Sequence, residues 1–116
     1  MDNTFISFYL KENKVHVFSE TLHGLGNPER ICFLLDQEGK RLLMLPYVKK
    51  DFVSHRVPDA VYRGTDSMEV NSKKLCRILA AQHSWDVSRS YRVPGVILAD
   101  RQVAAFDLTR AEQIAT

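Results

Sequence analysis

The sequence has few of the residues that mark several common classes of protein. It has only two cysteines among 116 residues, Cys32 and Cys76, and each lies in an apolar run. A disulfide scaffold of this size needs more cysteines, and a zinc site needs ligand pairs at closer spacing. We therefore expect two buried free thiols in a reducing compartment.

Long apolar runs and targeting signals are also missing. No apolar run reaches the roughly 20 residues of a transmembrane helix, and the opening stretch MDNTFISFYL has no basic residue ahead of its apolar part. The composition is 45% hydrophobic and 26% charged with a net charge of +2, which is typical of an ordinary globular domain. We expect one cytoplasmic domain over residues 1–116, with no membrane partner.

Motifs of catalysis are absent as well. The sequence contains no GxSxG, GxGxxG or HExxH, so it predicts neither an enzyme nor a cofactor. His16 and His23 can approach one another, but a metal site there lacks further ligands, and solvated histidines are the commoner alternative. Lys74 and Arg77 would lower the thiol pKa of Cys76 if it were exposed, whereas its apolar helical surroundings favour a packed thiol.

The first half of the sequence predicts two hairpins joined by a short helix. The apolar runs TFISFYL (4–10) and VHVF flank the polar turn KENK, and RICFLLD and RLLMLPY flank QEGK, with Gly39 in the turn. Between the hairpins, Ser19 is the predicted N-cap and Glu20 suits the positive end of the helix dipole. Gly26, followed by Asn-Pro, ends this helix.

The second half shows a similar order after a looser stretch. FVSHRV reads as a strand, PDAVYRGTDS as an irregular connection and SMEV as a short strand. Ser72 is then the predicted N-cap of an amphipathic helix, KKLCRILAAQHSW, whose end carries Trp85 as a core or interface anchor. SYRVPGVILAD and QVAAFDL predict a last strand pair around Asp100 and Arg101, and TRAEQIAT predicts a fraying helical tail.

The two halves align in a way that indicates an internal repeat. VHVFSETLHGLGN can be laid on SMEVNSKKLCRILAA so that these residues coincide: Val17 with Val70, Ser19 with Ser72, Leu22 with Leu75, and Leu25 with Ile78. We therefore predict an α+β fold, mainly β, forming a small barrel-like domain of two similar hairpin, short helix, hairpin halves, 4–50 and 51–110. The alternative is that the two stretches are unrelated and share only a common order of strands, turns and a helix.

This order resembles the SpoVT/AbrB family, whose fold is a swapped-hairpin β-barrel. Residues 13–46 follow the family's sequence of basic turn, strand, short helix and hairpin, with Lys14 at the turn and Leu25-Gly26 at the helix end. Residues 67–108 look like a more diverged copy. Two copies in one chain is the arrangement of the MraZ proteins, so the resemblance implies a bacterial DNA-binding regulator.

The sequence departs from the family pattern at several positions. Phe18 stands where the family has a proline before the helix, and the second copy has Asn71 there. The first helix, around His23, is nearly uncharged where the family often carries arginines that face DNA. Met68 occupies the place of the turn arginine in the second copy. The resemblance therefore supports the fold more than the function.

Basic residues in the first turn and the second helix form the candidate DNA interface. The full set is Lys11, Lys14, Lys73, Lys74, Arg77, Arg89 and Arg92. In a barrel of two copies we expect the two hairpin-to-helix corners on one side, and Lys73 and Arg77 project from one helix face. Tyr91, between Arg89 and Arg92, is available to stack or hydrogen-bond. The alternative is a solvated helix face and sheet edges, where lysine discourages strand aggregation.

Apolar residues predict the core and a second, covered sheet face. The expected core is Phe5, Phe8, Val15, Val17, Leu22, Leu25, Ile31, Phe33, Leu43, Leu45, Leu75, Leu79, Val96, Ile97 and Phe106. RICFLLD and RLLMLPY are apolar on both faces, so either the other half or a partner subunit is expected to cover the second face.

The sequence thus predicts a bacterial regulator of AbrB/MraZ-like type that contacts the phosphates of duplex DNA. The alternative is a protein-interaction or assembly module, such as a homodimer, with the same fold and no DNA binding.

Overall fold

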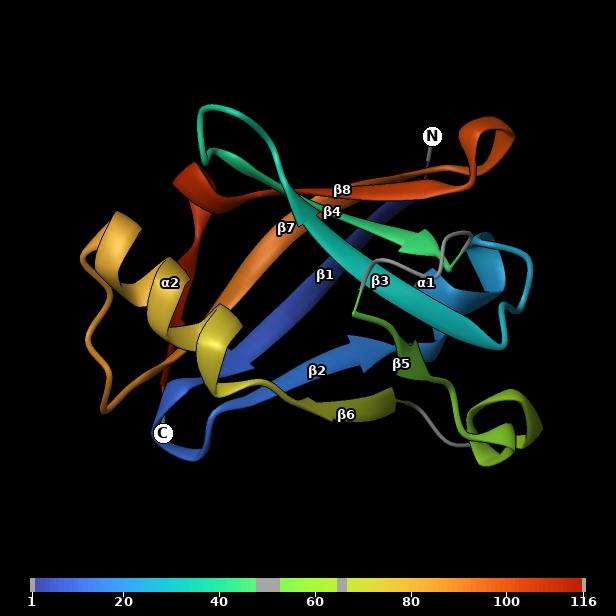
Figure 1. Ribbon diagram of the computed structural model, residues 1–116, viewed down its shortest axis with the longest axis horizontal. Coiled ribbons are helices and arrows are strands. Elements are labelled where there is room, and N and C mark those ends of the chain that lie inside the picture. Colours follow the sequence, from blue (N-terminus) through green and yellow to red (C-terminus); the bar gives the residue numbers. More distant parts are fainter. Residues whose placement is uncertain (1, 48–52, 65–66, 116) are drawn as a thin grey trace.

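The computed structural model describes residues 2–47, 53–64 and 67–115 (Figure 1). The strands are β1 (Asp2–Tyr9), β2 (Lys14–Phe18), β3 (Arg30–Leu35), β4 (Arg41–Pro46), β5 (His55–Arg56), β6 (Ser67–Asn71), β7 (Ser90–Leu98), β8 (Val103–Asp107) and β9 (Glu112–Ile114). The α-helices are α1 (Ser19–Gly24) and α2 (Lys73–His83), and the 3-10 turns are η1 (Leu10–Glu12), η2 (Asp59–Arg63), η3 (Ala99–Arg101) and η4 (Leu108–Arg110).

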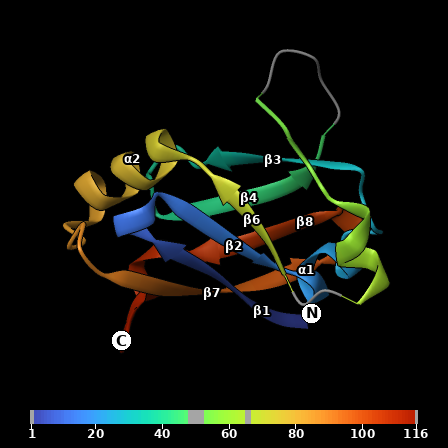
Figure 2. The same ribbon diagram turned by 90° about the horizontal axis from the view of Figure 1, so that it is seen from below.

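The strands form one antiparallel sheet that curls into a nearly closed barrel. Their order is β5-β3-β4-β8-β7-β1-β2-β6, and β9 pairs with the start of β7. Figure 2 shows the strands wrapping around a common interior, with α2 at one end and α1 at the other. The prediction of a small, mainly β, barrel-like fold is therefore confirmed.

The barrel interior holds the core, and the strand pleat decides which residues enter it. Alternate residues of β1 and β2 face inward, so that Ile6, Phe8 and Val15 are fully buried. On β4 the inward residues are Leu42 and Met44, which are fully buried. The core prediction was wrong for four residues: Phe5 is exposed, and Leu43, Leu45 and Val96 are partly buried outside the core cluster. Phe33 and Leu75 are partly buried but pack against the core.

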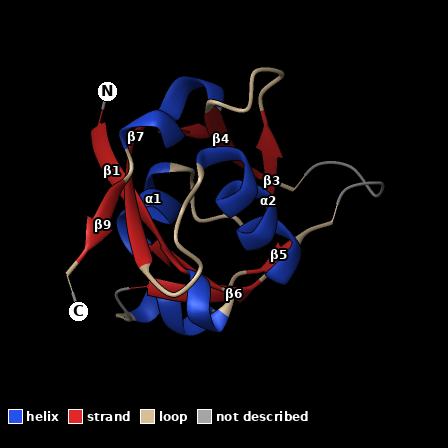
Figure 3. Cartoon of the chain, turned by 90° about the vertical axis from the view of Figure 1, so that its left-hand side faces the viewer, coloured by secondary structure: helices blue, strands red, loops and turns tan. Residues whose placement is uncertain are grey.

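The two α-helices cover opposite ends of the barrel. The short α1 packs against β1, β2, β7 and η2. The longer α2 packs against β2 and η1, and its last residue, His83, contacts the Gly39 carbonyl oxygen through Nε2 at 2.9 Å. Figure 3 looks onto the α2 side of the molecule. Each helix thus lies beside a turn of the sheet that is distant in sequence.

The helix boundaries confirm two predicted signals and correct a third. Ser72 is the N-cap of α2, with its Oγ accepting a hydrogen bond from the Leu75 amide at 3.2 Å. Gly26, with φ +87°, adopts the left-handed conformation just beyond α1. The prediction for Ser19 was wrong: Phe18 is the N-cap, without a side-chain bond, and Ser19 is already the first helical residue.

Three other segments differ from their predicted structure. The predicted helix over the tail TRAEQIAT is wrong: in the described residues 109–115 the end of the 3-10 turn η4 is followed by the strand β9, in which Glu112 pairs with Arg92 of β7. Within FVSHRV only His55–Arg56 is a strand, and residue 52 lies outside the described residues. The connection PDAVYRGTDS contains the 3-10 turn η2, which carries the buried Val61.

Candidate nucleic-acid interface

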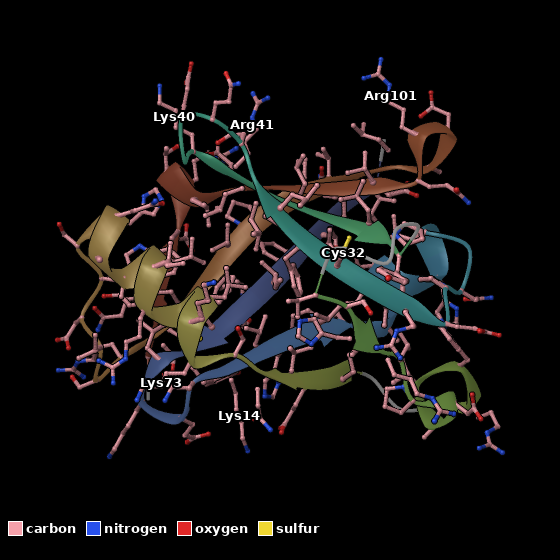
Figure 4. The ribbon with its side chains drawn as sticks, in the orientation of Figure 1. Lys14, Cys32, Lys40, Arg41, Lys73 and Arg101 are labelled. Atoms are coloured by element: carbon pink, nitrogen blue, oxygen red, sulfur yellow. The ribbon has the colours of Figure 1, made fainter. Side chains whose placement is uncertain are left out.

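The pairing of β2 with β6 brings the first turn next to the second helix. Lys14 lies opposite Asn71 in this antiparallel pair, and the Ser72 amide donates a hydrogen bond to the Asn13 carbonyl oxygen at 3.0 Å. The β1–β2 turn therefore lies beside the N-terminus of α2. In Figure 4, Lys14 and Lys73 project from the same corner of the molecule. The prediction that the two corners lie on one side was wrong: the β2–α1 and β6–α2 corners lie at opposite ends of this antiparallel pair, because Phe18 pairs with Ser67.

The helix α2 presents its basic residues to solvent. Lys73, Lys74 and Arg77 are exposed, whereas Cys76 and Leu79 on the opposite side are buried in the core. Lys73 and Arg77 are one helical turn apart and share a face, as predicted. No ion pair joins these three cations to another residue in the described parts of the chain. Their charges therefore remain available to an anionic partner.

Lys14 already takes part in an ion pair within the molecule. Its Nζ lies 3.3 Å from Oε2 of Glu69, and the other carboxylate oxygen, Oε1, lies 3.1 Å from His16 Nε2. Lys14 and Glu69 are both partly exposed, so this pair is weak and an incoming phosphate competes with it. The sequence analysis missed Glu69, although strand alternation places Lys14, His16 and Glu69 on the outer face of the sheet.

Lys11 and Arg89 complete the group at this end. Lys11 is exposed in η1, and the adjacent Leu10 amide donates a hydrogen bond to the Arg89 carbonyl oxygen at 3.3 Å. Arg89 Nε lies 3.9 Å from Asp86, and both side chains are exposed. We call the segments 11–14, 69–77 and 86–89 the basic end.

Tyr91 and Arg92 are not part of the basic end. Tyr91 stacks on Trp85, with ring centroids 4.9 Å apart, and its hydroxyl accepts a hydrogen bond from the Asp86 amide. It is therefore engaged within the molecule. The Arg92 guanidinium lies 5.5 Å from the ring centroid of Phe5, on the outer face of β1 and β7.

The outer face also carries a groove that the sequence analysis did not find. Its volume is about 920 Å³, and its lining includes Phe5, Arg41, Arg92, Pro94 and Arg110. It collects residues from both ends of the sequence, so no local motif marks it.

An aspartate lies between two of these arginines. The pKa of Asp107 is lowered first by the hydrogen bonds from the Thr109 hydroxyl and amide, and to a smaller extent by the nearby charges of Arg110 and Arg41. Asp107 and its two arginine neighbours therefore place both signs of charge along this border of the groove.

The thiols and histidines carry no sign of catalytic or metal chemistry among the described residues. Both cysteines are free and buried, and burial raises the pKa of Cys76 to about 11 although the Arg77 charge opposes the shift. Its thiol is therefore protonated at neutral pH. His16 contacts Glu69, and His23 contacts Asn27, so the two do not form a metal pair. The described residues hold no group of three metal-ligating side chains.

In the parts of the chain that the structure describes, no helix has the length and apolar character needed to cross a membrane. Comparisons of the chain with models of protein families, with curated proteins and with solved structures each found no match.

Proposed function

We propose that this chain binds duplex nucleic acid through the basic end, as a regulator that contacts the phosphates of DNA. The observation that carries the proposal is the placement of three separate segments at one end of the barrel, two by the β2–β6 pairing and the third by the backbone hydrogen bond between Leu10 and Arg89. Phosphate binding requires lysine and arginine gathered on one surface, and this arrangement supplies it.

The charge of the basic end differs from that of the remaining chain. The basic end contains Lys11, Lys14, Lys73, Lys74, Arg77 and Arg89 against Glu12, Glu69 and Asp86. Six basic residues thus face three acidic ones, which leaves ten basic and eleven acidic residues elsewhere in the sequence. A net charge of only +2 for the whole chain therefore hides a local excess.

The test is a binding titration against a mixed-sequence DNA duplex over a salt series. The variant Lys73→Ala with Arg77→Ala removes two exposed cations from the basic end. Each phosphate contact contributes about 0.9 to the slope of log affinity against log salt, so the double variant should lower the slope by about 1.8 and the affinity roughly 60-fold at 0.1 M salt.

A matched control removes two arginines from the opposite side. Arg63 in η2 and Arg101 in η3 are also exposed, and Arg63→Ala with Arg101→Ala changes the net charge by the same amount. This control should keep the wild-type slope. Equal losses of affinity in the two double variants would mean that DNA binding follows net charge alone. If the wild-type protein does not bind the duplex even at low salt, the proposed DNA-binding function is excluded.

We also propose that the fold consists of two diverged AbrB-like copies. Three observations support it. The sheet order β3-β4-β8-β7 places one predicted hairpin against the other, and β2 lies against β6. α2 contacts the β3–β4 turn at Gly39. A side chain added at Gly26, just after α1, would meet Gln102 of the β7–β8 turn at 3.6 Å.

Each helix in this arrangement lies against the hairpin of the other copy. Fragments 1–50 and 51–116, when co-expressed, should therefore purify together in equal amounts, because neither closes its own barrel end. Two fragments that fold separately as monomers would contradict the two-copy arrangement, while leaving the DNA-binding test unaffected.

The alternative function, an assembly module without DNA affinity, is favoured by one observation. The outer face of β3, β4, β7 and β8 carries two apolar rows, bordered by charged residues such as Arg41 and Asp107, and this face is distinct from the basic end.

A further inference from the structure

The outer face of four neighbouring strands carries a block of apolar side chains. The register places Leu34, Leu43, Ala105 and Val96 in one row across β3, β4, β8 and β7. The next row along the strands holds Cys32, Leu45, Val103 and Leu98. Since the residues between the two rows, such as Met44 and Ala104, fill the barrel interior, both rows point outward. We call these two rows the apolar face.

No helix in the described parts of the chain covers the apolar face. α1 packs on β1, β2 and β7 and α2 on β2, and both lie at the ends of the barrel (Figure 1). Apart from the buried Cys32, every member of the face is partly exposed. A contiguous apolar surface of this kind is a mark of a protein interface.

One border of the apolar face carries charges of both signs. Arg41 on β4 lies directly opposite Asp107 on β8, one step beyond the row that contains Leu43 and Ala105. Arg110 lies close enough to lower the pKa of Asp107, after the larger effect of the Thr109 hydroxyl. Figure 4 shows Arg41 projecting outward from the end of β4.

We propose that the apolar face binds a second copy of this chain, with a two-fold axis parallel to the strands between β4 and β8. This axis lays β4 of one copy over β8 of the other at the same height. Arg41 then faces Asp107 of the partner subunit, and the converse contact forms at the same time. The two sheets stack face to face at about 10 Å, as in a sandwich.

The side-chain sizes fit the same axis. Leu43 lies over Ala105 of the partner subunit, so a large side chain meets a small one in both directions. A two-fold axis across the strands would instead lay the charged border over apolar rows, so that its charges would meet no opposite charge across the interface. Charge and size therefore select one arrangement of two identical copies, whereas an unrelated partner would not need this self-complementarity.

The area of the apolar face sets the expected affinity of the dimer. Four strands at about 4.8 Å spacing, and three rows including the charged border, span roughly 20 Å by 20 Å. A standard interface buries about 800 Å² on each partner, so this one, at roughly 400 Å², is about half the standard size and belongs with weak, transient interfaces. We expect dissociation at about micromolar to tens of micromolar concentration.

The experiment is sedimentation equilibrium of the full chain from about 5 to 500 μM. The wild type should approach twice its monomer mass of 13.3 kDa as concentration rises. Leu43→Glu should stay monomeric. The matched control is Val87→Glu, because Val87 is 48% exposed in the loop after α2 and away from the face, and it should dimerise like the wild type.

Charge exchange tests the axis itself. Arg41→Glu and Asp107→Lys each put like charges together at both contacts, so each variant alone should be monomeric, while an equimolar mixture should form heterodimers. Repulsion within one subunit would not be relieved by mixing, so recovery identifies the contact between subunits. Circular dichroism confirms that each variant is folded, and a misfolded variant leaves the Leu43→Glu and Val87→Glu pair to decide.

The proposal fails if the wild type is monomeric at 500 μM, or if Leu43→Glu dimerises as well as Val87→Glu. Failure of the mixture to form heterodimers, with folded variants, overturns the proposed axis. Leu43→Glu, Arg41→Glu and Asp107→Lys all lie outside the basic end, so their effect on dimerisation is independent of DNA binding. Only the control Val87→Glu lies within the basic end, and it is read for dimerisation alone.

Discussion

The two ends of the barrel are built in the same way but have different surfaces. At one end β2 leads into α1, and at the other β6 leads into α2. The α1 end has six helical residues with the acidic Glu20 in the first turn, whereas α2 has eleven residues and begins with Lys73 and Lys74. The comparison shows that strand order sets where the helices lie, while a few exposed side chains decide which end attracts anions.

The largest contrast in stability is expected between two leucines that align in the sequence. Leu22 on α1 is fully buried, and Leu75 on α2 is only partly buried. Leu22→Ala should lower the free energy of unfolding by about 3 kcal/mol, and Leu75→Ala by about 1 kcal/mol. Urea unfolding measures both, and equal losses would show that the two helices are anchored alike.

A smaller contrast is expected at the helix starts. Ser72→Ala removes the hydrogen bond from the Leu75 amide and should cost about 1 kcal/mol, whereas Ser19 makes no capping bond. Ser19→Ala should therefore change the free energy of unfolding by only about 0.3 kcal/mol or less, since Ala is the better helix former. Thermal unfolding of the two single variants checks this, and a larger loss for Ser19→Ala would restore its predicted role as N-cap.

A last effect appears only at alkaline pH and concerns the buried thiol of Cys76 on α2. Burial raises the pKa of Cys76 from its ordinary value of 9.0 to about 11 in the folded chain. The thiol ionises more easily after unfolding, so its contribution to stability is complete below pH 9 and is lost as the pH rises toward 11. Between pH 8 and 11, the free energy of unfolding should fall less steeply with pH for Cys76→Ala than for the wild type. Parallel curves would contradict this.

The sequence predicted much of the fold because local signals agreed with it. Gly39, in the turn between β3 and β4, has a φ of +69°, and Ser72 caps α2 as its position indicated. The face of β4 was wrongly assigned because RLLMLP is apolar at almost every position, so that alternation leaves the register open. The strand β9 was missed because its pairing with β7 is a tertiary contact without a local pattern.

The candidate site was predicted in part, for a similar reason. Lys73, Lys74 and Arg77 share a helix, and helical periodicity alone places Lys73 and Arg77 on one face. Lys11, Lys14 and Arg89 join them only through strand pairing and a hydrogen bond to a backbone carbonyl. The pairing of Glu69 with Lys14 depends on the register of β6. The distance of Arg92 from the basic end depends on which face of β7 points outward.

The most direct test of the central claim is a residue-resolved map of DNA contact. Backbone amide NMR signals of the full chain would be followed during titration with a mixed-sequence duplex at low salt and again at high salt. We expect salt-sensitive shifts concentrated in segments 11–14, 69–77 and 86–89, with little change at the α1 end. Shifts spread evenly over both ends, or concentrated on the outer face of β3, β4 and β8, would contradict the assignment of the basic end as the nucleic-acid interface.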